Sequence, residues 1–172
     1  AISKRQPRTL TLRQLLEAYI EHRKEVIRRR TRYLLGKAED RKHIVDGLLI
    51  AQENIDRIIA IIRASKDREH AKIGLSDEFG LSDRQSQAIV DMRLGSLTGL
   101  ERAKLEDEHA ALVATILDLE DILARSTRVH AIIREDLEEI EDKYGDKRRT
   151  KISDMEVDSS IDIGDLISED LM

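Results

Sequence analysis

The sequence predicts an all-α fold, because its composition and its apolar spacing are both typical of long exposed helices. Charged residues make up 38% of the 172-residue chain, aromatic residues only 2%, and there is one proline. Ala, Leu, Glu, Lys and Arg favour helices, whereas a β-rich fold requires more aromatic and turn residues. Apolar residues also recur at alternating spacings of three and four. We therefore predict a long antiparallel two-helix coiled coil that carries a small helical globular head.

Five segments follow from the positions of these patterns and of the breakers between them. They are an extended N-terminal segment at residues 1–10, a first coiled-coil arm at 11–64, the head at 65–100, a return coiled-coil arm at 101–145, and an acidic linker toward a further domain at 146–172. The linker is assigned from charge, since residues 150–172 contain one lysine and seven acids, as in solvated connecting segments.

The first arm begins at a predicted capping box, Thr11 to Gln14. A heptad seam follows, and we expect one helix from Leu12 to Ile62, roughly 75 Å long. Four positions of its first half are cationic, namely Arg23, Arg30, Lys37 and Arg41. Because burying unpaired charge is costly, we expect that half to pack loosely or against another domain. The seam comprises Leu16, Ile20, Arg23, Ile27, Arg30, Leu34, Lys37, Arg41, Ile44, Leu48, Ala51, Ile55, Ile58 and Ile62.

Two short helices are predicted in the head. Asp67 begins the first helix, and Gly80 ends it in the left-handed conformation. A capping box from Ser82 to Gln85 begins the second helix, which runs to about Leu94. A third box, Thr98 to Glu101, opens the return arm.

The return arm has its own seam, which ends at a predicted glycine cap, Gly145. Neither amphipathic arm can bury its apolar stripe alone, so we expect the arms to pack antiparallel. Ser126 and His130 weaken the far end of the seam. Its positions are Leu112, Ile116, Leu119, Leu123, Ser126, His130, Ile133, Leu137, Ile140 and Tyr144.

Chemistry-bearing residues form no pattern that predicts an active site, so no catalytic, metal-binding or cofactor-binding residue is assigned. The chain has no cysteine, and its five histidines are scattered. Its apolar runs are shorter than the ~20 residues of a membrane span, and we expect a cytoplasmic protein. Two functions remain open: a protein-interaction device that uses the head, and a nucleic-acid-binding hairpin that uses residues 21–42. That stretch contains nine Lys/Arg and four acids, a pattern more typical of a solvated helix face.

Several motifs, in order along nearly the whole chain, resemble the A subunits of bacterial DNA gyrase and topoisomerase IV, the type IIA topoisomerases. The longest is SDRQSQAIVDMRLGSLTGLE at residues 82–101. HRKEVIRRRT at 22–31 and KAEDRKHI at 37–44 look closer to gyrase, and 54–56, 145–150 and 169–172 are also similar. Ser86 stands where the family commonly has Ala, and Gly95-Ser96 replaces larger residues.

The resemblance implies part of an enzyme rather than a whole one. In this family the head closes an exit gate, the C-gate, of a homodimer, and a transported DNA duplex leaves between two heads. The parent complex, two A and two B subunits, is an ATP-dependent topoisomerase assisted by Mg²⁺; gyrase introduces negative supercoils by double-strand passage. Its DNA-cleaving tyrosine lies upstream, and none of Tyr19, Tyr33 or Tyr144 matches it. A topoisomerase IV fragment, or an unrelated helical hairpin, is the alternative.

A contact surface between two heads is predicted on one face of the helix after Ser82. The residues assigned to it are Gln85, Ile89, Met92 and Arg93, with Leu97 and Thr98. The alternative is that Ile89 and Met92 fill the core of the head itself. The cations Arg23, Arg30, Lys37 and Arg41 are expected either to pack on the DNA-binding body of the parent or to line the cavity that holds the transported duplex.

Overall fold

The computed structural model describes residues 2–3, 6–92 and 99–150, and these confirm the all-α class. The chain divides into two compact units, Ala1–Leu137 and Glu138–Met172, and each is treated by itself below. A two-residue antiparallel ladder pairs β1 (Ile2–Ser3) with β2 (Gln6–Pro7). The helices are α1 (Leu12–Glu53), α2 (Ile55–Ala64), α3 (Arg68–Phe79), α4 (Asp83–Val90), α5 (Gly99–Ala124) and α6 (Ser126–Tyr144).

Helix α1 begins at the predicted capping box but ends earlier than the sequence suggests. The Gln14 N–H donates to Thr11 Oγ1 at 3.3 Å, and the Thr11 N–H donates to Gln14 Oε1 at 3.0 Å. The expectation of one helix to Ile62 is wrong, because α1 stops at Glu53 and α2 starts at Ile55. Between them, the backbone N–H and the side-chain amide of Asn54 both donate to the Ile50 carbonyl, at 3.2 and 2.9 Å. Asn side chains compete with helical backbone bonds in this way, which favours a helix end.

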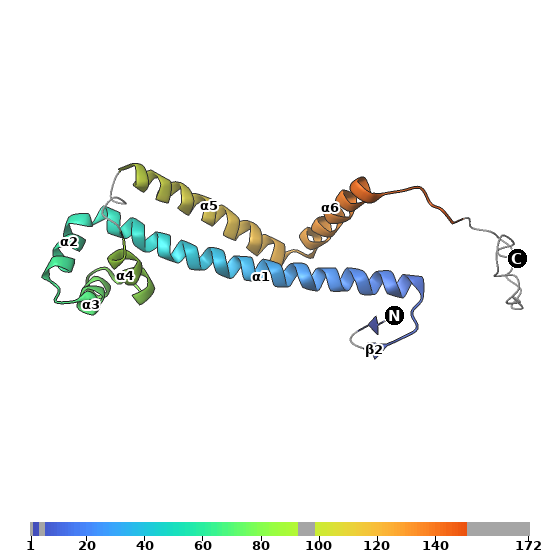
Figure 1. The fold of residues 1–172 in the computed structure, drawn as a ribbon, viewed down its shortest axis with the longest axis horizontal. Coiled ribbons are helices and arrows are strands. Elements are labelled where there is room, and N and C mark those ends of the chain that lie inside the picture. The colour runs from blue at the N-terminus through green and yellow to red at the C-terminus, as the bar shows by residue number, and fades with distance from the viewer. Residues whose placement is uncertain (1, 4–5, 93–98, 151–172) are drawn as a thin grey trace, which may run out of the picture. The chain divides into compact units, whose positions relative to one another are not determined.

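The antiparallel packing of the two arms is confirmed, since α5 runs back along α1 (Figure 1). Three contacts across the pair show its direction. Glu53 lies 3.8 Å from Arg102, and Asp46 lies 3.0 Å from His109 Nε2. Further along, Ile27 packs with Ile122 in a common core cluster. The positions in contact advance along the two helices in opposite directions, as an antiparallel pair requires.

The seam of α1 lies one residue later than predicted over its first half. Apart from Ile27, which belongs to both, the buried positions are Thr31, Ala38 and Val45, whereas Arg30 and Lys37 of the predicted seam are exposed. The shift falls in the half of α1 where Ile27 packs with Ile122 of α5, and the contacts of α4 with α1 lie further along, as at Gly47 (Figure 1). The cost of burying the predicted seam cations therefore does not arise.

The return arm is interrupted at Arg125, so the prediction of one uninterrupted helix is wrong there. Helix α5 ends at Ala124 and α6 begins at Ser126. Beyond the break, Val129 and Ile133 are buried in the cluster with Ile27 and Ile122, whereas Ser126 and His130 are exposed. Serine favours helix ends over interiors, and the Arg125 N–H still donates to the Asp121 carbonyl at 3.0 Å. The predicted weak positions of the seam thus coincide with the break.

Helices α2, α3 and α4, called here the α2–α4 cluster, share a core with the end of α1. Its buried members are Ala51, Ile58, Leu75, Leu81 and Ile89. Asp67 caps α3 by accepting from the His70 N–H at 2.9 Å, and Gly80 ends it with φ 65°, both as predicted. The third predicted capping box begins at Thr98, which lies outside the described residues.

The second unit is described from Glu138 to Thr150. Within it α6 ends at Tyr144, and the Gly145 N–H donates to the Glu141 carbonyl at 2.7 Å. A Cβ added to Gly145 would lie 2.4 Å from that carbonyl oxygen, so the close approach requires glycine. The predicted linker is described only to residue 150, and the predicted domain boundaries stay a prediction.

Candidate interaction surface of the α2–α4 cluster

Helix α4 is fixed to α1 by a glutamine that fills a glycine gap. Gln85 Nε2 donates to the His43 carbonyl at 2.8 Å, and Gln85 Oε1 accepts from the Ser82 N–H at 3.0 Å. The His43 ring nitrogen Nε2 and Ser82 Oγ lie 2.7 Å apart. A Cβ on Gly47 would lie 2.7 Å from Gln85 Cγ, so α1 and α4 can approach this closely only because Gly47 has no side chain. The α2–α4 cluster is therefore attached firmly to the end of α1.

This docking decides the environment of three residues on α4. Ser86 is fully buried, Ile89 is 2% exposed and Gln85 is 8% exposed. A side chain with so little exposed area has almost none to offer a partner chain, so we take Gln85 and Ile89 out of the proposed contact surface. Ile89 lies in the core of the α2–α4 cluster, which is the alternative given for it in the sequence analysis. Within the described residues, the Ser86 hydroxyl has no hydrogen-bond partner.

Four other predicted contact residues lie at the end of α4 or beyond it. Met92 is half-buried, and its N–H donates to the Ile89 carbonyl at 3.1 Å. Arg93, Leu97 and Thr98 lie outside the described residues. The contact surface itself therefore stays a prediction, now centred on Met92 and the residues that follow it.

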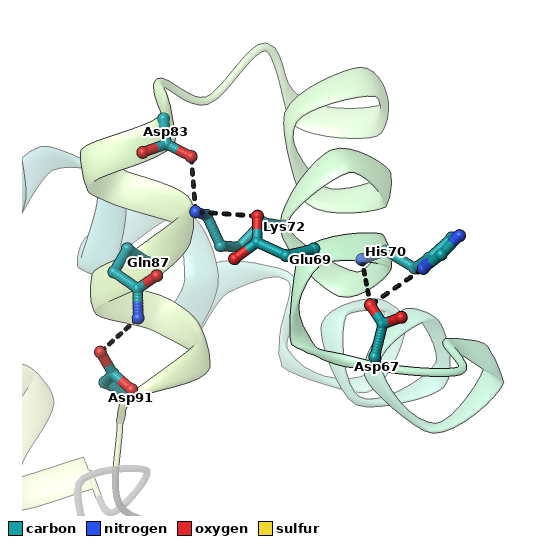
Figure 2. A network of polar contacts seen from close by, with 7 residues as sticks. All are labelled: Asp67, Glu69, His70, Lys72, Asp83, Gln87 and Asp91. Carbon is teal, nitrogen blue, oxygen red and sulfur yellow. Dashed lines mark hydrogen bonds and ion pairs between the residues drawn. The ribbon is translucent and has the colours of Figure 1, made fainter.

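A polar network joins α3 to α4 on the outside of the cluster (Figure 2). Lys72 Nζ lies 2.7 Å from Asp83 and 3.3 Å from Glu69, and its side chain is only 11% exposed. The hydrogen bond to Asp83 is the main cause that raises the pKa of Lys72. Asp91, in turn, forms an ion pair with Arg68 and accepts from Gln87 at 2.6 Å. These links hold α3 and α4 as one rigid element.

The four cations assigned to a DNA-facing role fall into two groups. Arg23 pairs with Asp136, and Arg41 binds Glu108 through two hydrogen bonds, of 2.6 and 2.9 Å. Arg30 and Lys37 are exposed and form no ion pair within the described part of the chain, although the Lys37 ammonium lies 5.7 Å from the Tyr33 ring centre. The first pair of cations ties the two arms together, whereas the second pair is exposed to solvent.

Comparison with known proteins supplies the family. A family model for the DNA gyrase/topoisomerase IV A subunit matches residues 1–138. The chain belongs to this family. It is 51% identical over 170 residues to the DNA gyrase A subunit of Clostridium acetobutylicum, and 53% identical over 163 residues to that of Streptococcus pneumoniae serotype 4. These matches cover 99% and 95% of the chain but 20% of each relative, so the chain spans about a fifth of their length.

The residues that join one helix of this chain to another were not predicted from the sequence. Gly47 gave a weak signal, since a glycine inside a helix costs about 1 kcal/mol against alanine and must be explained. The contact of His109 with Asp46 gave no signal, because both are ordinary surface residues until the register of the arms is known. No three His, Cys, Asp or Glu side chains of the described residues are placed to hold a metal ion, and none of the described helices could span a membrane.

Proposed function

We propose that this chain is the C-gate part of a DNA gyrase A subunit, in which the α2–α4 clusters of two copies meet and close the exit for a transported duplex. The observation that carries the proposal is the docking of α4 on α1 through Gln85 and Gly47. Movement of the helical arms can open the gate only if the surface that meets the other copy is fixed to those arms. The α1–α5 pair forms the arms, and the α2–α4 cluster is fixed to their end.

In the proposed parent, two A subunits work with two B subunits and duplex DNA in the cytoplasm. Strand cleavage, ATP hydrolysis and Mg²⁺ binding belong to other parts of that complex, which would introduce negative supercoils by passing one duplex through another. We assign no catalytic role to any residue of this chain. Its part is mechanical: it separates two regions of space and reopens once per passage.

A gate contact must close specifically and reopen each cycle, so a moderate apolar patch with a polar rim is expected. An ordinary interface of this kind buries about 800 Å² per partner. Met92, half-buried at the end of α4, supplies one apolar centre, and the proposal adds Arg93, Leu97 and Thr98. Asp91, paired with Arg68, is the described part of the polar rim.

Mass in solution tests the proposal. The chain is expected to sediment as a dimer at micromolar concentration, and Met92→Asp as a folded monomer with an unchanged circular dichroism spectrum. Ile73→Asp is the matched control, because Ile73 is an apolar residue of the same cluster that is already 58% exposed; this variant should remain dimeric. If Met92→Asp unfolds, Met92→Ala should retain the fold and weaken the dimer. A wild-type monomer, or a Met92→Asp dimer of unchanged strength, contradicts the proposed gate.

The second candidate is the same gate in the A subunit of a topoisomerase IV, because the matching family model covers both enzymes. The relatives reported above are gyrase subunits, which favours the first candidate.

A further inference from the structure

An ion pair joins the start of α3 to the end of α4. Arg68, the first residue of α3, binds Asp91, the residue directly after α4. The Asp91 carboxylate also accepts from the side chain of Gln87 at 2.6 Å (Figure 2). The side chains of Arg68 and Asp91 are 62% and 50% exposed, so burial does not force them together. Asp91 directly precedes Met92, the described residue that the gate proposal places at an apolar centre of the contact.

Each charge of this pair stands at the unfavourable end of its helix. A helix carries partial positive charge at its N-terminus and partial negative charge at its C-terminus. Arg68 is a cation at the start of α3, whereas its neighbours Asp67 and Glu69 are acids, as the dipole favours. Asp91 is an anion at the end of α4, and the last turn of α4 contains no basic residue. The two charges therefore offset each other's unfavourable position.

A second link between the same two helices is arranged in the favourable sense. Asp83, an acid in the first turn of α4, lies 2.7 Å from Lys72 of α3 (Figure 2). At the start of α3, the hydrogen bond from the backbone N–H of His70 is the main cause that lowers the pKa of Asp67, as expected for an acid at a helix start. Of the two links, the one arranged against the helix dipoles is the one beside Met92.

The backbone at the end of α4 connects this ion pair to Met92. The Met92 N–H donates to the Ile89 carbonyl at 3.1 Å, which closes a tight last turn, and Ile89 is fixed in the core. This hydrogen bond and the ion pair of the preceding residue, Asp91, both restrain Met92. Without Arg68, the carboxylate would remain beside the last carbonyl groups of α4, which repel it, and the last turn would open.

We propose that the Arg68–Asp91 pair positions Met92 for contact with the second copy, and that its reversed polarity keeps this restraint weak enough to be released when the gate opens. For stability alone, an acid at the start of α3 and a cation at the end of α4 would be better. Departures from such local rules are expected mainly at functional sites. The inference rests on the proposed function, because it assigns the regulation of that same contact.

The first variant removes the charge and keeps the shape of the side chain. Asp91→Asn can still accept from Gln87, but it loses the ion pair. At about 50 mM NaCl, where screening is weak, its dimer should dissociate about two- to fivefold more readily in analytical ultracentrifugation. The thermal midpoint of the dilute monomer should stay within about 2 °C of the wild type, because the lost attraction and the lost repulsion offset each other. At about 500 mM NaCl the two dimers should become equal in strength.

The second variant reverses the pair, Arg68→Asp/Asp91→Arg. It keeps the attraction and places both charges at the favourable helix ends, so the thermal midpoint of the dilute monomer should rise by about 2–4 °C. Its dimer should be at least as strong as that of the wild type. An unchanged midpoint would contradict the reversed polarity. A dimer as weak as that of Asp91→Asn would show that one of these side chains meets the other copy directly, which overturns the positioning role.

The matched control is Glu78→Gln, which breaks an exposed ion pair of the same cluster. Glu78 accepts from Arg57 at 2.8 Å, and this pair joins α2 to α3 instead of α3 to α4. The Glu78→Gln dimer should be as strong as that of the wild type, and equal weakening in Glu78→Gln and Asp91→Asn would overturn the inference. A wild-type dimer that Asp91→Asn leaves unchanged removes this inference alone, whereas a wild-type monomer removes the gate and this inference with it.

Discussion

The two ends of α1 are built very differently. Near the α2–α4 cluster, from Asp40 to Glu53, the helix is covered on two sides, and Val45 and Ala51 are completely buried. At the other end, from Leu12 to Arg23, the apolar residues stand in solvent. Their exposures are 73% for Leu12, 47% for Leu15, 55% for Leu16, 44% for Tyr19 and 38% for Ile20.

The difference shows where tertiary contacts stabilise this chain. At the N-terminal end, α1 is held as a helix by its capping box and by local pairs such as Arg13 with Glu17, each worth fractions of a kcal/mol to about 1 kcal/mol. At the cluster end, burial of whole side chains contributes about 1.5–3 kcal/mol for each large residue. Substitutions that are chemically alike should therefore have unequal effects at the two ends.

The largest contrast is expected between two leucine deletions. Leu75 is fully buried in the core of the α2–α4 cluster, whereas Leu16 is half exposed. Leu75→Ala should lower the free energy of unfolding by about 2–5 kcal/mol, because it leaves a cavity as well as losing apolar contact. Leu16→Ala should change it by about 0.5 kcal/mol or less. Urea denaturation followed by circular dichroism measures both.

Equal losses for the two leucines would show that Leu16 is covered in solution, for example by another copy. Repeating the Leu16→Ala measurement over a range of protein concentrations identifies that case, because a contact between copies makes the loss depend on concentration.

A smaller effect, with opposite signs, is expected for two glycines inside the same helix. A Cβ on Gly47 would meet Gln85 Cβ and Cγ at 2.8 and 2.7 Å, whereas a Cβ on Gly36 has no neighbour within 4 Å among the described residues. Gly47→Ala should destabilise the chain by about 1–3 kcal/mol through forced separation of α1 and α4. Gly36→Ala should stabilise it by up to about 1 kcal/mol, since alanine is the better helix former.

Thermal unfolding compares the two alanine variants directly. A stabilising Gly47→Ala would mean that α4 is not docked as described, and it would remove the main support for a rigid gate. A destabilising Gly36→Ala would instead indicate an unrecognised contact on the middle of α1.

The features that the sequence predicted well are local ones. Both described capping boxes, the N-cap Asp67 and the left-handed Gly80 depend on residues within one turn of each other, so their chemistry can be recognised without the fold. The antiparallel pairing was also predictable, because each arm has an apolar stripe that it cannot bury alone.

The features that the sequence did not predict are the exact register of the seam, the breaks in the two arms and the choice between core and contact residues. The seam of α1 lies one residue later than the apolar pattern indicates at Thr31 and Ala38, and the contacts of α4 with α1 lie further along, as at Gly47. The helices are interrupted at Asn54 and Arg125, although the apolar periodicity of the sequence continues across both residues. In the candidate site, Ile89 on α4 has the spacing of both a contact residue and a core residue, and only the position of α1 decides between them.

The smallest expected effect concerns charge at the cluster end, where Glu108 of α5 accepts two hydrogen bonds from Arg41 of α1. The hydrogen bond is the main cause that lowers the pKa of Glu108 below its usual range. A carboxylate with a lowered pKa stabilises the fold above the pKa of the unfolded chain, about 4.3, and this contribution is lost as pH falls through the lowered folded-state pKa.

Glu108→Gln should therefore reduce stability by about 0.5 kcal/mol at pH 7, a small value because the Glu108 side chain is 35% exposed and solvent screens the pair. Its unfolding midpoint should converge with that of the wild type below about pH 4. Glu17→Gln is the comparison at the N-terminal end, where the pair with Arg13 lies within one exposed turn of α1, and its effect at pH 7 should be smaller still. A Glu17 effect as large as that of Glu108 would show that the pair between the arms adds nothing beyond a local pair, since of these two carboxylates Glu108 is the one whose ion pair joins α5 to α1.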